Sequence, residues 1–226
     1  MTTLWLARHA NRQDFADPDW RASADRPHDP GLSDDGVEQA KRLARRMTDL
    51  GIDRILASPF LRAVETAHPA ADALETPLFL EPGLGEWLNT DWFEEPPKTR
   101  STPTLAEHFP RTSQDHSACR TPTYPESRHF ALARLGATGQ CLADRYDGET
   151  LLVVGHGITV QGVLHGLIGS DVPDSGCPLA SLTKVSGAGD DWSTSGTTRA
   201  TSKTAPVRPT GWPDAEADRR WGAGHR

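Results

Sequence analysis

The sequence predicts an α/β fold of three layers, in which helices cover both faces of a mostly parallel central sheet. Two observations support this prediction. Short apolar runs alternate along the chain with segments of helical periodicity, and this alternation is typical of parallel sheets with helical crossovers. In addition, residues 150–155 (TLLVVG) are rich in leucine and valine without a polar interruption at 151–154, as expected for a strand that is covered on both faces.

The first part of the chain predicts strands and helices in turn. Residues 4–7 (LWLA) form an apolar run that predicts a buried strand. Apolar residues then recur at three- and four-residue spacing after Ser33, which predicts a helix with Ser33 as its N-cap and an end near Gly51. A strand, a helix and a weak strand follow, at residues 52–58, 60–74 and 78–81. Pro69 should bend or shorten that helix.

The second part of the chain continues the alternation after a gap. A long helix is expected at residues 126–146, although Gly136 and Gly139 weaken its helical propensity. The remaining expected elements are the strand at residues 150–155, a helix at residues 158–168 and a last strand at residues 179–185.

Two segments do not follow this pattern. The 226 residues are only 36% hydrophobic and include 20 Gly and 18 Pro, so part of the chain must be poor in core residues. Residues 87–125 show no sustained period and predict a loop-rich cap insertion. Residues 186–226 are rich in Gly, Ser and Thr and predict an irregular tail. We therefore expect one domain at residues 1–185 followed by this tail.

Composition excludes several classes of function. The net charge of -7 disfavours general binding to nucleic acid or to anionic membranes, and no apolar run approaches the ~18 residues of a membrane span. The N-terminus lacks the features of a secretory signal. Because the three cysteines are scattered, neither a zinc site nor a disulfide framework is indicated. The cysteine pattern therefore favours a reducing cytoplasm, and a cytoplasmic location is the resulting expectation.

Histidines follow two of the expected strands. His9 comes after the first strand and His156 after the strand at 150–155, and ligands of open α/β sheets bind beyond the carboxyl ends of the strands. Arg8, Arg12 and Arg62 are expected at the same edge. Each residue taken alone is ordinarily structural, but together they predict a phosphate site in which a histidine could attack phosphorus.

Three stretches resemble the motifs of a known family. Residues 6–12 (LARHANR) resemble the RHG signature of the histidine phosphatase superfamily, residues 58–67 (SPFLRAVETA) its second motif, and residues 153–157 (VVGHG) its second-histidine motif. The resemblance covers roughly residues 2–185 and implies the phosphoglycerate mutase-like fold.

Finer features resemble one subgroup of this family. Residues 81–87 (EPGLGEW) and residues 12–14 (RQD), with Trp20 nearby, resemble the phosphatase domain of the ubiquitin-associated and SH3-domain proteins and the related steroid-phosphate phosphatases. This subgroup resemblance also implies a homodimer.

The resemblance implies a mechanism without metal or cofactor. His9 would form a phosphohistidine, and Glu86 would protonate the leaving alcohol and then activate water. His156 would be a further hydrogen-bond donor to the phosphate oxygens. The phosphate oxygens would be held by Arg8, Arg12 and Arg62. Should Glu86 not be the acid, the fallback candidate is Glu81, and weaker ones are Glu94 and Glu95.

Two residues depart from the family pattern. Ala10 stands where the family has glycine, so a methyl group would narrow the pocket floor, and a positive φ there would be strained. Asn11 replaces the acidic residue that the subgroup often has before its second arginine. Both departures bear on catalytic efficiency more than on membership of the family.

These residues leave three functions to compare. The first is a metal-independent phosphomonoesterase that acts on a small phosphorylated metabolite or on an aryl or steroid-like phosphate. The alternatives are a phosphomutase of the phosphoglycerate mutase type and a catalytically weak, phosphate-binding regulatory domain. Aromatic residues that could stack on a substrate, or equally form a satellite core, are Trp92, Phe93, Phe109 and Tyr124. Lys98 and Arg100 could select a second anionic group.

Overall fold

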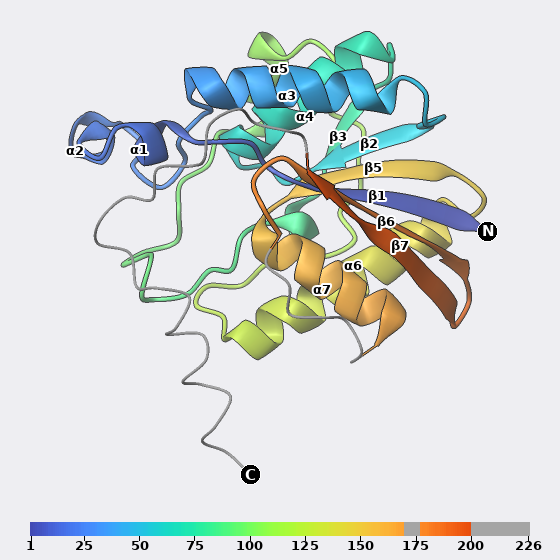
Figure 1. Ribbon diagram of the computed structural model, residues 1–226. Coiled ribbons are helices and arrows are strands. Elements are labelled where there is room, and N and C mark those ends of the chain that lie inside the picture. Colours follow the sequence, from blue (N-terminus) through green and yellow to red (C-terminus); the bar gives the residue numbers. More distant parts are fainter. Residues whose placement is uncertain (170–176, 200–226) are drawn as a thin grey trace.

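A single seven-stranded sheet forms the centre of the structure, a computed structural model that describes residues 1–169 and 177–199. The strand order is β4-β3-β2-β5-β1-β6-β7 (Figure 1). The strands are β1 Thr2–Arg8, β2 Arg54–Ala57, β3 Leu78–Leu80, β4 Thr112–Ser113, β5 Thr150–Gly155, β6 Ser181–Ala188 and β7 Asp191–Arg199. All neighbours from β4 to β1 pair in parallel, whereas β6 and β7 pair antiparallel.

Helices cover both faces of this sheet (Figure 1). The helices are α1 Gln13–Ala16, α2 Trp20–Ser23, α3 Asp34–Met47, α4 Leu61–Ala73, α5 Thr102–His108, α6 Arg128–Arg145 and α7 Gly157–Ile168, with a 3₁₀ turn, η1, at Pro82–Leu84. In β5, Leu152 and Val154 pack in the core beneath α3 and α4, while Leu151 and Val153 pack in the core with α6 and α7. This alternation follows from the two-residue period of a strand and confirms the predicted three-layer fold.

The two glycines of α6 have a packing role that the sequence analysis did not predict. Instead of only weakening the helix, Gly136 lies against Gly166 of α7 so closely that a Cβ atom on Gly166 would come 2.3 Å from the Gly136 Cα. A Cβ on Gly139 would likewise lie 2.8 Å from Val163. The glycines therefore allow α6 and α7 to pack backbone against backbone, which offsets their low helical propensity.

Two predictions about helices and loops need correction. Pro69 lies inside α4 and does not shorten it, because the helix runs on to Ala73; the predicted bend stays a prediction. Burial of the apolar face of α4 against the sheet outweighs the one backbone hydrogen bond that proline removes. The expected cap insertion is loop-rich, but it also contains α5 and β4.

The predicted irregular tail is wrong over residues 186–199. These residues complete β6 and form β7, which pairs with β6 along the edge of the sheet. Strand pairing uses backbone groups, and an edge strand tolerates polar side chains, so a Gly-, Ser- and Thr-rich composition does not exclude it. Residues 200–226 of the predicted tail lie outside the described residues.

The cysteine prediction also needs correction. Cys119 and Cys141 form a disulfide that joins the segment after β4 to α6, with their Cα atoms 6.1 Å apart. Their wide separation along the chain concealed this proximity. The cysteine pattern therefore no longer argues for a reducing compartment.

None of the helices in the described part of the chain is long and apolar enough to cross a membrane.

Candidate active site

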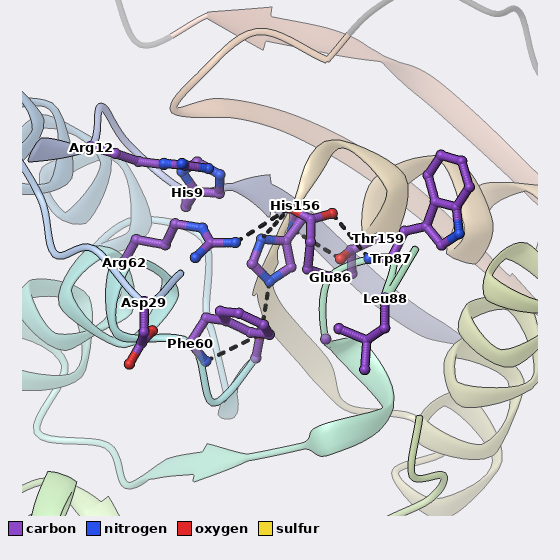
Figure 2. A network of polar contacts seen from close by, with 12 residues as sticks. His9, Arg12, Asp29, Phe60, Arg62, Glu86, Trp87, Leu88, His156 and Thr159 are labelled. Carbon is purple, nitrogen blue, oxygen red and sulfur yellow. Dashed lines mark hydrogen bonds and ion pairs between the residues drawn. The ribbon is translucent and has the colours of Figure 1, made fainter. Parts of the chain in front are cut away.

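The candidate site lies beyond the carboxyl ends of the parallel strands, where Figure 2 shows the side chains converging. His9 follows β1, Ser58 follows β2, and His156 follows β5 and begins α7. Backbone bonds hold two of these turns in place, because the His9 amide donates to the Gly155 carbonyl (2.8 Å) and the Ser58 amide donates to Val154 (2.9 Å). The central sheet thus fixes the spacing of the site.

His9 is buried in a state suited to nucleophilic attack. Its Nδ1 lies 2.8 Å from the Ala10 carbonyl oxygen, and since a carbonyl only accepts, Nδ1 carries the proton and Nε2 keeps its lone pair. Burial, followed by the positive charges of Arg62, Arg8 and Arg12, holds the pKa of His9 well below its ordinary value. The imidazole is therefore neutral at physiological pH.

The half-buried Arg8 and the buried Arg62 flank His9. Arg8 donates from Nη1 to the Cys177 carbonyl oxygen (2.7 Å), and burial lowers its pKa. Arg62, in the first turn of α4, lies with its Nη2 atom 3.3 Å from Glu86 Oε2. Burial, with Arg12 nearby, lowers the pKa of Arg62 to about 10, so its guanidinium group still carries a positive charge at neutral pH.

Several buried nitrogens of this cluster have no hydrogen-bond partner in the described part of the chain, and those of the arginines are all donors. They are the Arg8 Nε, the Arg62 Nε and Nη1 atoms, and the His156 Nδ1. Leaving a buried donor unpaired costs about 1–3 kcal/mol, so such a cluster is expected where a ligand supplies the acceptors. A compact oxyanion with several oxygens, such as phosphate, meets this requirement.

His156 is fully buried behind Glu86. Its Nε2 lies 2.9 Å from Ser58 Oγ, and its Nδ1 lies 3.3 Å from Glu86 Oε2, at ion-pair distance but without hydrogen-bond geometry. Burial and the charge of Arg62 hold the pKa of His156 well below its ordinary value. The structure therefore places His156 against the carboxylate as well as beside His9, with ring centroids 5.5 Å apart.

Among the candidate acids, the structure brings Glu86 alone to the cavity. Glu86 lines the cavity together with Arg8, His9 and Arg62, and its Oε1 accepts from the Trp87 amide (3.1 Å). The fallback Glu81 is fully buried and accepts from the amides of Gly83 and Cys119 and lies 2.9 Å from His116 Nε2. Burial raises the pKa of Glu81, but these hydrogen bonds outweigh that effect and lower it. Glu94 and Glu95 are exposed and do not line the cavity.

Arg12 reaches the cavity as part of a charged group. Its guanidinium is paired with Asp14, which also accepts two hydrogen bonds from Arg21 at 2.8 and 3.0 Å. Burial opposes ionisation of Asp14, but the two arginines hold its pKa below the ordinary value. Both Arg12 and Arg21 line the cavity, so Asp14 orients them while neutralising one of their two charges.

The outer part of the cavity contains residues that sequence reasoning missed. They are Phe15, Arg21 and His28, which join Trp92 and Phe93 at the rim. The one usable signal was the position of Phe15 directly after residues 12–14 (RQD), which carry part of the subgroup resemblance. Arg21 and His28 come from short or irregular segments that gave none.

Tyr124 and Phe109 take the second of the two roles predicted for them, because they pack in or against the core instead of lining the cavity. Tyr124 packs with Phe60 and Phe93 and donates to the Phe93 carbonyl, and Phe109 packs against the core on the α3 and α4 side. Arg100 pairs with the buried Asp29 (3.1 Å), and Lys98 pairs with Glu95 at the surface. Neither cation lines this cavity, so selection of a second anionic group by Lys98 and Arg100 stays a prediction.

The two departures from the family motif are accommodated by the structure. Ala10 is fully buried in a small cluster with Leu32, Ala40 and Ala180 and does not line the cavity. Its φ is not among the positive values of the described residues, so the expected strain is absent. The Asn11 amide donates to Gln39 Oε1 (3.1 Å), which ties this loop to α3.

Comparison with known proteins agrees with this geometry. A family model described as the histidine phosphatase superfamily (branch 1) matches residues 4–198. The chain is 30% identical over 172 residues to the adenosylcobalamin/alpha-ribazole phosphatase of Salmonella typhi, covering 73% of this chain and 77% of that protein.

Two further comparisons are informative. The chain is 30% identical over 188 residues to the transcription factor tau 55 kDa subunit of Saccharomyces cerevisiae, which covers 76% of this chain but only 42% of that protein. The crystal structure of the ecdysone phosphate phosphatase from Bombix mori, in complex with tungstate, superposes with a TM-score of 0.70 at 20% identity, covering 96% of this chain and 99% of that one. At this identity the likeness shows the fold.

Proposed function

This chain belongs to the histidine phosphatase superfamily, and from that premise we propose that it is a metal-independent phosphomonoesterase that works through a phosphohistidine. The observation that carries the proposal is the set of unpaired buried nitrogens around the neutral His9. They offer a place for phosphate oxygens next to the lone pair that would attack phosphorus.

In the first step, His9 Nε2 attacks the phosphorus atom and the bond from phosphorus to the ester oxygen breaks. Arg8 and Arg62 stabilise the charge on the transferring group. Glu86, starting as a carboxylic acid, gives its proton to the departing oxygen, so that an alcohol leaves rather than an alkoxide.

In the second step, the Glu86 carboxylate accepts a proton from a water molecule, whose oxygen attacks the phosphorus of phosphohistidine. The phosphorus–nitrogen bond breaks, inorganic phosphate is released, and His9 returns to its neutral form. Glu86 is protonated again and ready for the next ester.

The rim of the cavity suggests the kind of alcohol that leaves. Phe15, Trp92 and Phe93 line the same cavity as Arg8 and Arg62, and aromatic rings favour flat apolar groups. We therefore place aryl or steroid-like phosphates ahead of small sugar phosphates. The names of the similar phosphatases do not decide this order, because they include an ecdysone phosphate phosphatase and a phosphoserine phosphatase.

A panel of phosphomonoesters without added metal tests the proposal. Wild type should release phosphate from aryl esters, whereas His9→Ala should lose at least about 10⁴-fold in kcat, as loss of a nucleophile costs in other covalent enzymes. Equal slow release by both proteins would refute the phosphatase assignment. Isomerisation of a phosphorylated glycerate faster than its hydrolysis would favour the mutase, and phosphate binding without turnover would favour a regulatory domain.

A further inference from the structure

We propose that Arg134, held by Glu126, is a positioning residue for the general acid Glu86. The inference rests on the proposed function, in which Glu86 moves a proton to the leaving group and from water. It assigns a role to a buried ion pair that lies outside the cavity and that no step of the mechanism uses directly.

Glu86 sits on backbone that has little support of its own. β3 ends at Leu80, and the chain reaches Glu86 through the short turn η1 and Gly85. Residues 85–88 belong to no helix or strand, so their carbonyl groups have no ladder of regular partners. The orientation of the Glu86 carboxylate therefore depends on contacts with other parts of the molecule.

Thr138 and Thr159 donate to the carbonyl oxygens of Gly83 (3.3 Å) and Leu84 (2.9 Å), and Arg134 of α6 supplies the donors closest to the acid. Its Nη1 donates to the carbonyl oxygens of Gly83 (2.7 Å) and Gly85 (3.2 Å), and its Nη2 donates to the carbonyl oxygen of Glu86 itself (3.2 Å). One rigid guanidinium group thus fixes three carbonyls of the segment that presents the acid. A lysine, with a single nitrogen, could not reach all three in this geometry.

Glu126 binds both Arg134 and the two residues that follow Glu86 in the chain. Its two oxygens accept from Arg134 Nη2 (2.5 Å) and Nε (3.1 Å), and the two side chains are only 7% and 3% exposed. The Oε1 atom of Glu126 also accepts from the Leu88 amide (3.2 Å), and its backbone carbonyl accepts from Trp87 Nε1 (2.8 Å). The pair therefore holds the backbone both before and after Glu86.

A merely structural role and a positioning role predict different kinetics. Loss of fold lowers the amount of active enzyme and affects every substrate equally. A displaced acid affects only those esters whose leaving group needs a proton, and a shift of about 1 Å can cost about 10²-fold. The ratio of kcat/KM for two esters in one preparation is independent of the amount of active protein, so it separates the two roles.

The experiment uses 4-nitrophenyl phosphate and 4-nitrobenzyl phosphate, which carry the same ring. The nitrophenolate departs as a stable anion, whereas the benzyl alkoxide needs the proton. Arg134→Met should lower kcat/KM for the benzyl ester about 10²-fold and for the phenyl ester less than about 5-fold. Arg134→Lys and Glu126→Gln should show smaller losses with the same selectivity.

Arg54→Met provides the matched control. Arg54 also pairs with a glutamate, Glu149 (2.6 Å), but at the opposite end of the sheet, so its removal should leave the ratio unchanged. Equal losses on both esters in Arg134→Met, or none, would overturn the positioning role.

Glu86→Gln separates this inference from the proposed function. If Glu86→Gln shows the selective loss and Arg134→Met does not, only the positioning role fails. If Glu86→Gln loses no activity toward the benzyl ester, then Glu86 is not the acid, and the assignment of the acid and the role of Arg134 both fail.

Discussion

The inner end and the rim of the cavity are built in different ways. The inner end, with Arg8, His9 and Arg62, is fixed by the strands of the central sheet and by the first turn of α4, and several of its arginine nitrogens lack acceptors among the described residues. The rim comes from the four-residue helices α1 and α2 and from irregular backbone, and there Arg21 is already paired with Asp14.

This difference suggests that the inner end of the cavity carries out catalysis, whereas the rim determines which ester binds. The inner end holds unsatisfied positive charge at a cost in stability, which is the usual sign of a site organised for a ligand. The rim presents aromatic side chains on segments that the sheet does not restrain. We therefore expect changes at the inner end to affect turnover of every ester, and changes at the rim to affect the choice of ester.

Removal of an inner arginine should have the largest effect. Arg62→Met should lower kcat/KM about 10³-fold for all esters, because the buried guanidinium contributes charge to the transition state. Steady-state kinetics on aryl and alkyl esters measures this. A loss confined to one class of ester would contradict the proposed division of the cavity.

Phosphate binding should distinguish the two regions through stability. At 100 times its dissociation constant, inorganic phosphate should stabilise the wild-type protein by about 2.7 kcal/mol. Thermal melts with and without phosphate should show this shift for Trp92→Ala and little of it for Arg62→Met. The reverse pattern would place the anion at the rim.

The buried histidines of the inner end should make stability depend on pH. His9 and His156 have lowered pKa values when folded, so below about pH 6.5 the unfolded chain binds protons that the folded protein does not. Stability is therefore full above this pH and falls as the pH drops, by at most about 1.4 kcal/mol per unit for each histidine. Urea unfolding at pH 7.5 and 5.5 should show a smaller decrease for His156→Gln than for wild type.

A rim substitution should have the smallest effect. Trp92 is 37% exposed and packs edge-on against Trp87, so Trp92→Ala should lower kcat/KM for bulky aryl esters about 2- to 10-fold. Small alkyl esters should be hydrolysed as by wild type. A uniform loss across the ester series would show that the tryptophan supports the site rather than selects the substrate.

The sequence predicted the inner end well for a physical reason. The apolar runs before His9 and His156 are strands because both faces of the sheet are buried, and the strand ends then necessarily meet at one edge. The motif at residues 81–87 identified Glu86 as the candidate acid. The sequence did not show that Arg134 of α6, 48 residues further along the chain, donates a hydrogen bond to the Glu86 carbonyl oxygen.

What the sequence did not predict depends mainly on side-chain contacts that have no pattern in the sequence. Arg21 lines the cavity and pairs with Asp14, and the role of Glu81 follows from the amides of Gly83 and Cys119. The Cys119–Cys141 disulfide joins cysteines 22 residues apart in the sequence. The β6–β7 hairpin did have a local signal, because only Gly189 and Asp190 separate the two strands, but the polar composition of residues 186–199 favoured an irregular tail.

Trapping of the phosphorylated enzyme tests the central claim most directly. Wild-type protein would be mixed with an excess of 4-nitrophenyl phosphate, quenched in alkali to preserve acid-labile phosphohistidine, digested and examined by mass spectrometry. Glu86→Gln should accumulate more of the intermediate than wild type, because hydrolysis of the intermediate loses its base. We predict phosphate on His9 and none in His9→Ala. Turnover without phosphorylation of His9, or phosphate on another residue, would contradict the account.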